Sequence, residues 1–545
     1  MHGARYAKRV ACAAAVALAA TACGGGDSDG GGSDGAGVLS ASWGDPQNPL
    51  EPANTNEVQG GKVLDMIFRG LKRYNPETGA AEDMLAEKIE TSDSQNFTIT
   101  IKDGWTFQNG EKVTAKSFVD AWNYGAGLKN NQRNAYFFGY IEGYDQVHPE
   151  DGSKQTADTM SGLKVVDDKT FTVKLTQKFS TFPDTLGYPA FAPLPQSFFT
   201  DHAGWIAKPV GNGPYQIDSY AKGSQMSLRK WDQYPGDDKA QNGGVDLKVY
   251  TDNNTAYTDL IAGNLDLVDD VPASQLKNVN NDLQGRYLNT PAGIIQTLAF
   301  PFYDPQWNKA DSDKVRKGLS MAINRKQITD TIFQKTRTPR HRLDLAGAGQ
   351  GGRLPGRAVR GVLRLRPGAG EEADPGGRRP AGRAGEDLVQ RGHRLAQAVG
   401  GRRLQLHQQR PRQRQGVRGQ PGRHVRRLPH QDHAEKKMTG PFRAGWQMDY
   451  PLIQNFLQPL YYTNASSNDG KWSNKEFDSL VDQANQETDT GKAIQLFQQA
   501  EEVVRDNMAA IPLWYQNGSA GWSDRLSNVK LNPFSVPVYN EIKVG

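Results

Sequence analysis

One short stretch of the chain combines an acid, an aromatic ring and a base at close spacing. It runs Arg443-Ala-Gly-Trp-Gln-Met-Asp-Tyr-Pro451, so Asp449 follows Trp446 by three residues and precedes a Tyr-Pro turn. Residues 452–460 are mostly apolar, which predicts a poorly hydrated surrounding for this carboxylate. Such a carboxylate needs a cation, either from Arg443 or from a ligand ammonium, with Trp446 as an apolar wall or cation–π face. An ordinary loop acid beside a core tryptophan is the alternative on spacing alone.

Residues suited to catalysis or to metal binding are scarce in most of the chain. Outside the N-terminal segment and an unusual block at 339–435, the histidines are His148 and His202, and neither lies near a nucleophile motif. The same part of the sequence has no P-loop, HExxH or CxxC pattern. We therefore expect no catalytic residues, no metal site and no cofactor, and an extracellular hydrolase is a weak alternative.

Strand-like and helical patterns alternate along the chain, which predicts a mixed α/β fold. Phe97–Ile101 alternates apolar and polar residues as a half-buried strand does. Thr114 is a candidate N-cap for a helix that carries Phe118, Ala121 and Trp122 on one side. Further patterns are strands through Phe171, Val173 and Leu175 and through Leu247 and Val249, a hairpin turn at Asn109-Gly110, and helical stripes at Val315–Ile323, Phe477–Ala484 and Ala493–Val504.

The first residues predict export. A basic start is followed by an apolar run, 10–22, that is too short to span a bilayer. Small residues lead to Cys23, and glycines follow it. We expect 1–22 to be a signal peptide and 23–37 a flexible Gly/Ser/Asp tether. Because Cys12 leaves with the signal, no disulfide is expected in the mature domain.

Six segments lie in order along the chain, at Gly70-Leu71 with Tyr74 and Leu85-Ala-Glu87, Gly104–Ala115, Pro209–Tyr215, Val315–Arg325, Arg443–Pro451 and Ile511–Trp514. Together they resemble the extracytoplasmic solute-binding proteins of family 5, the oligopeptide- and dipeptide-binding proteins of ABC importers. Small residues before Cys23 also resemble a lipobox, in which the cysteine is acylated; an ordinary signal peptide with an incidental cysteine is the alternative.

The resemblance implies a periplasmic-binding-protein fold of type II, or cluster C, with two lobes, a hinge cleft and an inserted subdomain. Lobe I would combine 38–64, 206–300 and 512–545. The subdomain would span 65–205, and lobe II would span 301–511. Closure of such lobes around a ligand is a hinge motion.

The resemblance also implies a function without catalysis, namely capture of oligopeptides outside the membrane and their delivery to the permease subunits of an ABC transporter. The protein would be a monomer, lipid-anchored through Cys23 to the outer face of the cytoplasmic membrane, with no nucleic-acid partner. Asp449 would hold the peptide ammonium, Trp446 would wall the cleft, and Arg443 would meet a carboxylate or orient the loop. Another solute, such as a nickel chelate, a sugar or haem, is the alternative. Further implied ligand contacts, for which ordinary surface or packing is the alternative, are Tyr450, Tyr136, Asn56, Val58 and Asp269.

Residues 339–435 have a composition unlike the rest of the chain. They lack Lys, Ser, Thr, Asn, Ile, Met, Phe, Tyr, Trp and Cys, and 341–430 holds 20 arginines against six acids. That local charge of +14 exceeds the net +5 of the chain, so the remainder carries −9. A nucleic-acid-binding arm is one interpretation, but aromatic rings for base stacking are missing. A low-complexity linker is another, although a long structureless insert is unusual within a compact lobe.

A shifted reading frame accounts best for this block. Every residue type present has a codon that begins with C or G, and a −1 shift moves the C- or G-rich third base of a GC-rich gene to the first position. His341 before Arg342 then reverts to Thr or Ile, and a compensating shift near His433–Lys436 restores the frame. On this interpretation, the G-x-G-x-x-G match at 347–352 and the six histidines of the block are products of the wrong reading frame and not functional motifs. We expect the block to form no packed core; the remaining alternative is that the chain as written folds incompletely.

Overall fold

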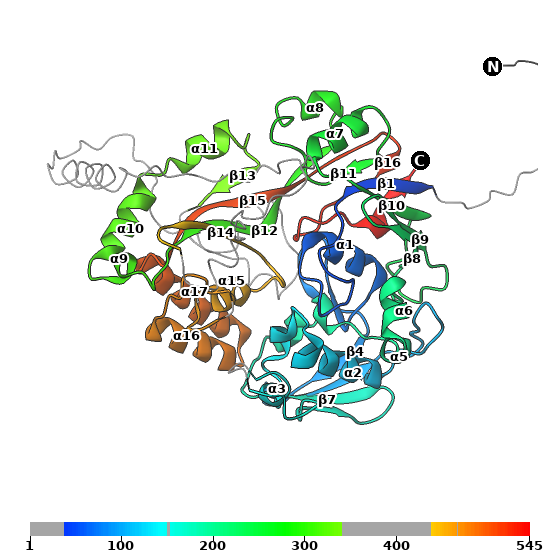
Figure 1. Cartoon of the computed structure of the whole chain (residues 1–545), viewed down its shortest axis with the longest axis horizontal. Helices are drawn as coiled ribbons and strands as arrows, with labels where there is room; N and C mark the ends of the chain where they lie inside the picture. Colours follow the sequence, from blue (N-terminus) through cyan, green and yellow to red (C-terminus); the bar gives the residue numbers. More distant parts are fainter. Residues whose placement is uncertain (1–36, 150–152, 341–437, 466) are drawn as a thin grey trace, which may run out of the picture. The chain divides into compact units, whose positions relative to one another are not determined.

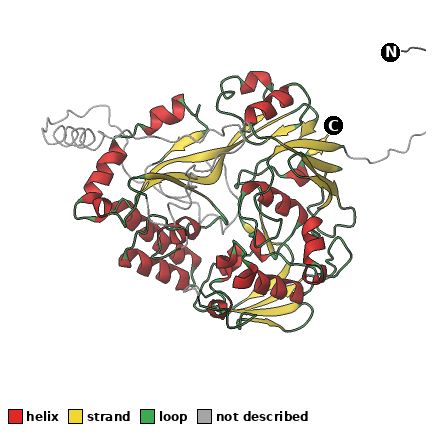
Figure 2. Ribbon diagram, viewed as in Figure 1, coloured by secondary structure: helices red, strands yellow, loops and turns green. Residues whose placement is uncertain are grey.

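The computed structural model describes residues 37–149, 153–340, 438–465 and 467–545 (Figure 1). The expected signal peptide, Cys23, all of the tether except Gly37, and all but the first two residues of the 339–435 block lie outside the described residues. Within the described part, helices and strands are interspersed (Figure 2), which confirms the predicted mixed α/β class.

The largest sheet in the described residues has nine strands in the order β14-β12-β15-β11-β1-β10-β9-β8, with β13 also paired to β15. Strand β1 runs parallel to β10 and β11, and the other pairs are antiparallel. The bounds are β1 (Val38–Trp43), β8 (Tyr215–Ala221), β9 (Gln225–Lys230), β10 (Gly244–Val249), β11 (Leu267–Val268), β12 (Tyr287–Ala299), β13 (Arg337–Pro339), β14 (Phe442–Gln447) and β15 (Ala510–Trp522).

Strands β12 and β15 form a long antiparallel ribbon within this sheet. Their pairing runs from Tyr287 opposite Gly521 to Ala299 opposite Ala510, with two register shifts along β12. Strand β14 pairs with the other edge of β12, where Gln447 lies opposite Ile294. The sheet therefore fixes the chain two residues before Asp449.

A separate four-stranded sheet has the order β4-β5-β7-β6, and α2 (Ala115–Ala126) packs on it. Thr114 is the N-cap residue of α2, as predicted. Phe118 stacks on Phe171 of β7 with ring centres 5.9 Å apart, and Trp122 meets the same ring edge-on at 5.5 Å. The four strands are β4 (Ala86–Glu90), β5 (Asn96–Ile101), β6 (Leu163–Val165) and β7 (Thr170–Lys174), and the two-stranded pairs are β2 (Lys72–Tyr74) with β3 (Ala81–Asp83) and β16 (Leu526–Ser527) with β17 (Lys543–Val544).

Most of the other described helices are short. The predicted stripe at 315–323 is helical only to Met321, because the chain turns at Ala322. The α-helices are α1 (Val58–Ile67), α3 (Tyr144–Val147), α4 (Phe182–Thr185), α5 (Gln196–Thr200), α6 (His202–Ala207), α7 (Asn253–Ile261), α8 (Val279–Asp282), α9 (Pro305–Asn308), α10 (Ser312–Met321), α11 (Arg325–Thr331), α15 (Gln454–Tyr461), α16 (Lys475–Gln486) and α17 (Thr490–Asp506). The 3-10 helices are η1 (Leu128–Asn130), η2 (Ala135–Phe138), η3 (Pro189–Phe191) and η4 (Tyr539–Glu541).

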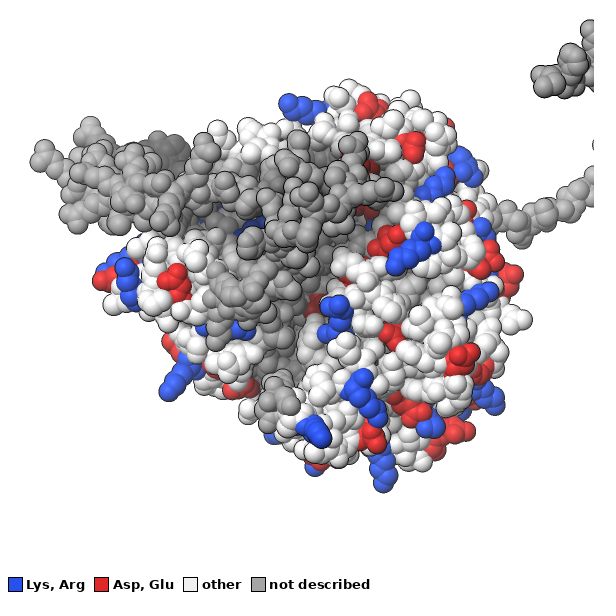
Figure 3. All heavy atoms as spheres, in the orientation of Figure 1, with Lys and Arg blue, Asp and Glu red and all other residues white. Residues whose placement is uncertain are grey.

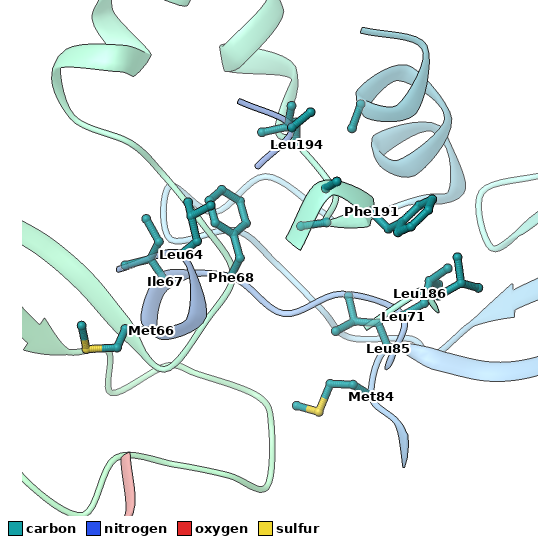
Figure 4. Close-up of a cluster of buried hydrophobic side chains, with 14 of the residues drawn as sticks. Leu64, Met66, Ile67, Phe68, Leu71, Met84, Leu85, Leu186, Phe191 and Leu194 are labelled. Atoms are coloured by element: carbon teal, nitrogen blue, oxygen red, sulfur yellow. The ribbon is translucent and has the colours of Figure 1, made fainter. Parts of the chain in front are cut away.

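Three buried apolar clusters hold these elements together. The first contains Leu64 and Ile67 of α1, which lie near Phe191 of η3 (Figure 4). The second lies among α15, α16 and α17, and the third lies between α7 and α8. The expected bounds of the two lobes and the subdomain stay predictions.

Two further observations concern the described surface and helices. On the face in Figure 3, basic and acidic side chains are interspersed rather than gathered by sign. Among the described residues, every helix is too short or too polar to cross a membrane.

Candidate functional site

A cavity of about 460 Å³ lies among the described residues. Five segments and Asp238 form its wall. The segments are α1 with the loops on both sides of it, the β2–β3 hairpin, η3 with the turn before it, the end of β14 with the loop after it, and the chain between 532 and 541. Asp449 lies in this wall, and so do Asn56 and Val58. Three of the eight predicted contact residues thus border one cavity.

Helix α1 brings one of its faces to this cavity. Glu57 caps it by accepting a hydrogen bond from the Gly60 amide at 2.9 Å, which satisfies a free donor of the first turn. The buried face carries Val63 and Ile67, and this apolar burial fixes the helix. Val58, 40 % exposed, begins the face that borders the cavity.

Asp449 is held in place by Asn455 of α15. The Asp449 amide donates to Asn455 Oδ1 at 2.8 Å, and Asn455 Nδ2 donates to Asp449 Oδ2 at 3.0 Å. The Trp446 indole also donates to Asn455 Oδ1, at 3.0 Å. One buried side-chain amide therefore positions both the acid and the tryptophan of the predicted motif.

The carboxylate of Asp449 has no cationic partner in the described part of the chain. Burial raises the pKa of Asp449 to about 7, and the hydrogen bond from Asn455 opposes that rise. Of the two alternative cations, Arg443 is exposed on β14 and makes no ion pair with Asp449 among the described residues, which leaves the ligand ammonium. The expected role of Arg443 in meeting a ligand carboxylate or orienting the loop stays a prediction. The cavity wall thus contains a carboxylate whose ionised form a bound cation would stabilise.

Aromatic side chains border the cavity around this acid. Tyr74 and Phe534 lie with ring centres 5.3 Å apart, and Phe137 stacks on Tyr188 at 4.2 Å from behind the wall. A side chain at Gly187 would collide with the Tyr74 ring, since an added Cβ would lie 2.7 Å from it. One sequence signal pointed to these residues, namely the family-like segment that contains Tyr74, and no signal pointed to Tyr188 or Phe534.

Tyr136 and Tyr450 lie beside Asp449 but outside the cavity wall. Tyr136 packs on Phe137 with ring centres 4.6 Å apart and stays 39 % exposed. The buried Tyr450 hydroxyl donates to Gln454 Oε1 at 2.6 Å. Their predicted roles as ligand contacts stay predictions.

Trp446 and Asp269 occupy different positions from those predicted. Trp446 packs against the second apolar cluster and borders a small hollow of about 40 Å³ instead of the cavity. Asp269 lies behind the wall in a buried ion pair with Lys62, and Lys62 borders the cavity. Neither side chain touches the large cavity in this arrangement.

The four basic side chains in the cavity wall are all engaged by protein carboxylates. Lys62 pairs with Asp269, Arg69 with Asp238 at 2.8 Å, and Lys72 with Asp83 at 2.6 Å. Arg73 lies 3.6 Å from Glu82 and 3.5 Å from both Asp237 and Asp238. No group of three or more His, Cys, Asp or Glu in the described part of the chain is placed to hold a metal ion.

Comparison with known proteins identifies the family. The model of the bacterial extracellular solute-binding proteins, family 5, matches residues 81–352. The chain belongs to this family. It is 26 % identical over 504 residues to the oligopeptide-binding protein OppA of Bacillus subtilis, with 88 % of each chain covered. It is also 24 % identical over 483 residues to the probable deoxycholate-binding periplasmic protein YgiS of Escherichia coli, with 86 % of each covered.

The fold agrees with that of other family 5 solute-binding proteins. OppA of Burkholderia pseudomallei superimposes with a TM-score of 0.72 at 19 % identity, covering 94 % of this chain and 100 % of the other. The periplasmic-binding-protein-like fold is thereby confirmed. Family 5 proteins bind solutes and are not an enzyme family.

Proposed function

We propose that this family 5 protein captures short peptides by their N-terminal ammonium group and delivers them to the permease of an ABC transporter. The observation that carries the proposal is Asp449, a carboxylate in the cavity wall with no cationic partner in the described residues. Support also comes from the relative in Bacillus subtilis, whose name is that of an oligopeptide-binding protein.

An ammonium group would satisfy Asp449 in two ways. It would supply the missing positive charge, and it would donate hydrogen bonds to the oxygen that Asn455 leaves free. Because protein surrounds the carboxylate, an added cation there interacts more strongly than it would in water. A ligand with a blocked N-terminus would leave Asp449 unpaired or protonated.

The aromatic wall suits ligands of varied side chain. Tyr74, Tyr188 and Phe534 offer apolar surface that accepts many shapes. Peptide recognition that tolerates varied sequences relies on groups that every peptide shares, such as its terminus and main chain. Asp449 would bind the terminus that every peptide has, and the aromatic rings around it would accept side chains of different shape.

Isothermal titration calorimetry with tri-alanine and N-acetyl-tri-alanine tests this proposal. We expect tri-alanine to bind, and Asp449→Asn to weaken its binding about a hundredfold or more, since breaking a buried pair costs about 3–5 kcal/mol. Acetylating the peptide should lower its affinity for the parent protein by a similar factor, and its affinity for Asp449→Asn by far less. The double-mutant cycle built from these four affinities isolates the interaction between the ammonium group and Asp449. A matched control is Asp482→Asn, which removes an acid that accepts hydrogen bonds from Tyr462 outside the cavity wall.

Two outcomes would change the proposal. Equal affinity of the parent for free and acetylated peptide would remove Asp449 from its role. If neither peptide nor longer alanine peptides bind, a non-peptide solute such as a sugar, haem or a nickel chelate becomes the better hypothesis.

The proposal includes a lipid anchor at Cys23 on the outer face of the cytoplasmic membrane. Its support is the order of basic start, short apolar run, small residues and cysteine. We expect Cys23→Ala to move the protein from the membrane fraction to the medium, with Cys12→Ala as the control that leaves it membrane-bound. A Cys23→Ala variant that remains in the membrane fraction would refute the anchor.

A further inference from the structure

A second carboxylate of the cavity wall also lacks a partner. Asp65 lies on α1, one turn after Gly61, and both residues border the cavity. The Asp65 carboxylate makes no hydrogen bond and no ion pair with any residue that the structure describes. The Asp65 side chain is exposed. The protein around the cavity still desolvates the carboxylate and raises its pKa above the usual value, while the nearby Arg69 charge opposes that rise.

The nearest base cannot neutralise Asp65 fully, because it is committed elsewhere. The Arg69 guanidinium binds Asp238 through two nitrogens, each 2.8 Å from Asp238 Oδ2. The wall as a whole contains seven acids and four bases, and each base has its own carboxylate within 4 Å. The uncompensated charge of the cavity is therefore negative.

Space for a ligand group lies next to Asp65. An added Cβ at Gly61 would meet no atom within 4 Å, so the helix face is open one turn before the acid. The groups that act on Asp65 are Arg69 and Asp238, whereas Asp449 is held by Asn455. Asp65 and Asp449 thus have different neighbours within one cavity wall.

We propose that Asp65 selects ligands that carry a second cationic group, which for a peptide is a lysine or arginine side chain. This inference rests on the proposed peptide binding and specifies its ligand class. A bound cation would give Asp65 the partner that the protein does not provide. A glutamate side chain at the same place would meet an unpaired like charge and would be rejected.

The test compares matched tetrapeptides by calorimetry. Lysine, norleucine or glutamate replaces one alanine of tetra-alanine, at the second, third and fourth position in turn. Norleucine keeps most of the lysine chain and removes its charge. At one position at least, we expect lysine to bind about tenfold more tightly than norleucine, and glutamate to bind most weakly.

Two variants and a control assign the preference to Asp65. Asp65→Asn should remove the advantage of lysine, and Asp65→Lys should reverse the order so that glutamate binds best. The control, Glu77→Gln, removes the same charge from the wall at a carboxylate that Lys530 already engages at 3.1 Å. It should keep the preference for lysine.

The outcomes separate this inference from the proposed function. If tetra-alanine binds but lysine gives no advantage at any position, the selective role of Asp65 is refuted and peptide binding stands. The role is equally refuted if Asp65→Asn keeps the advantage, or if Glu77→Gln abolishes it as fully as Asp65→Asn. If no tetrapeptide binds, the proposed function fails and this inference falls with it.

Discussion

Asp449 and Asn455 are joined by two hydrogen bonds that use both ends of the asparagine amide, at 2.8 and 3.0 Å. Because Asn455 is 1 % exposed, its amide has a fixed orientation and transmits that orientation to the carboxylate. Asn455 is a neutral donor, so it positions Asp449 without neutralising it. The cavity acid is therefore held rigidly and left in need of a cation.

Replacing Asn455 tests this positioning. We expect Asn455→Ala to weaken the binding of tri-alanine about tenfold, because hydrogen bonds to charged groups contribute about 1.5–3 kcal/mol. The control is Asn468→Ala, since Asn468 is equally buried but bonds within its own loop, to Tyr462 and Trp472. Calorimetry should show parent-like affinity for the control at a lowered Tm. An Asn455→Ala protein that binds as the parent does would contradict the positioning role.

Peptide affinity should depend on pH because the pKa of Asp449 is about 7. A bound ammonium favours the ionised acid, so binding below pH 7 requires Asp449 to release its proton. Affinity for tri-alanine should then fall about tenfold per pH unit between pH 6.5 and 5. Above pH 7 it should stay level until the peptide amine deprotonates near its usual pKa of about 8. Calorimetry at pH 5.5 and 7.5 that gave equal affinities would contradict this coupling.

The same pKa predicts a stabilising substitution in the ligand-free protein. The folded pKa of about 7 lies above the usual value of 3.8, so ionising Asp449 opposes folding. That opposition is absent below pH 4, grows between pH 4 and 7, and is constant above pH 7. Asp449→Asn, which mimics the neutral acid, should raise Tm by about 1–3 °C at pH 8 and leave it unchanged at pH 4. A Tm shift of equal size at both pH values would show that ionisation is not its cause.

The buried pair of Lys62 and Asp269 predicts a large loss of stability. Both side chains are less than a tenth exposed. Lys62→Met should lower the free energy of unfolding by about 3–5 kcal/mol, because Asp269 would then be buried and unpaired. The double variant Lys62→Met/Asp269→Asn should recover most of this loss in urea titrations. If the double variant is as unstable as the single one, the loss comes from packing rather than from the stranded charge.

The block at 339–435 predicts a change in the coding DNA. Sequencing from the codon of Thr338 to that of Lys437 should find an insertion or deletion at each end, relative to the gene of a close relative. The corrected frame should restore Lys, Ser, Thr and aromatic residues, which the block lacks. A relative whose gene encodes the same arginine-rich block in the same frame would refute the shift.

Local patterns predicted much of the fold. The strand at Phe97–Ile101, the N-cap at Thr114 and the apolar stripe from Phe477 to Ala484 are all present, because each depends on side-chain spacing within one element. The helix through Ile323 was predicted two residues too long, since the turn after Met321 has no glycine or proline to mark it.

The candidate site was predicted less completely, because its geometry depends on residues far apart in the chain. The motif located Asp449, yet its partner proved to be Asn455 rather than Arg443. Asp269 forms an ion pair with Lys62, which lies about two hundred residues earlier in the chain. No pattern in a single sequence predicts such a long-range ion pair. Tyr188 and Asp65 were missed for the same reason.

The ribbon of β12 and β15 sets a limit on the order of folding. Ala299 pairs with Ala510, so this part of the sheet closes only after nearly the whole chain has been synthesised. The second apolar cluster includes Ile511 and Tyr515 of β15, so it too waits for that strand. A ribosome that lost the frame in the block and did not regain it before residue 510 would make a chain without β15, which pairs with β11, β12 and β13 in the nine-stranded sheet. Such a product would expose an unpaired edge on β12, which marks it for aggregation or proteolysis.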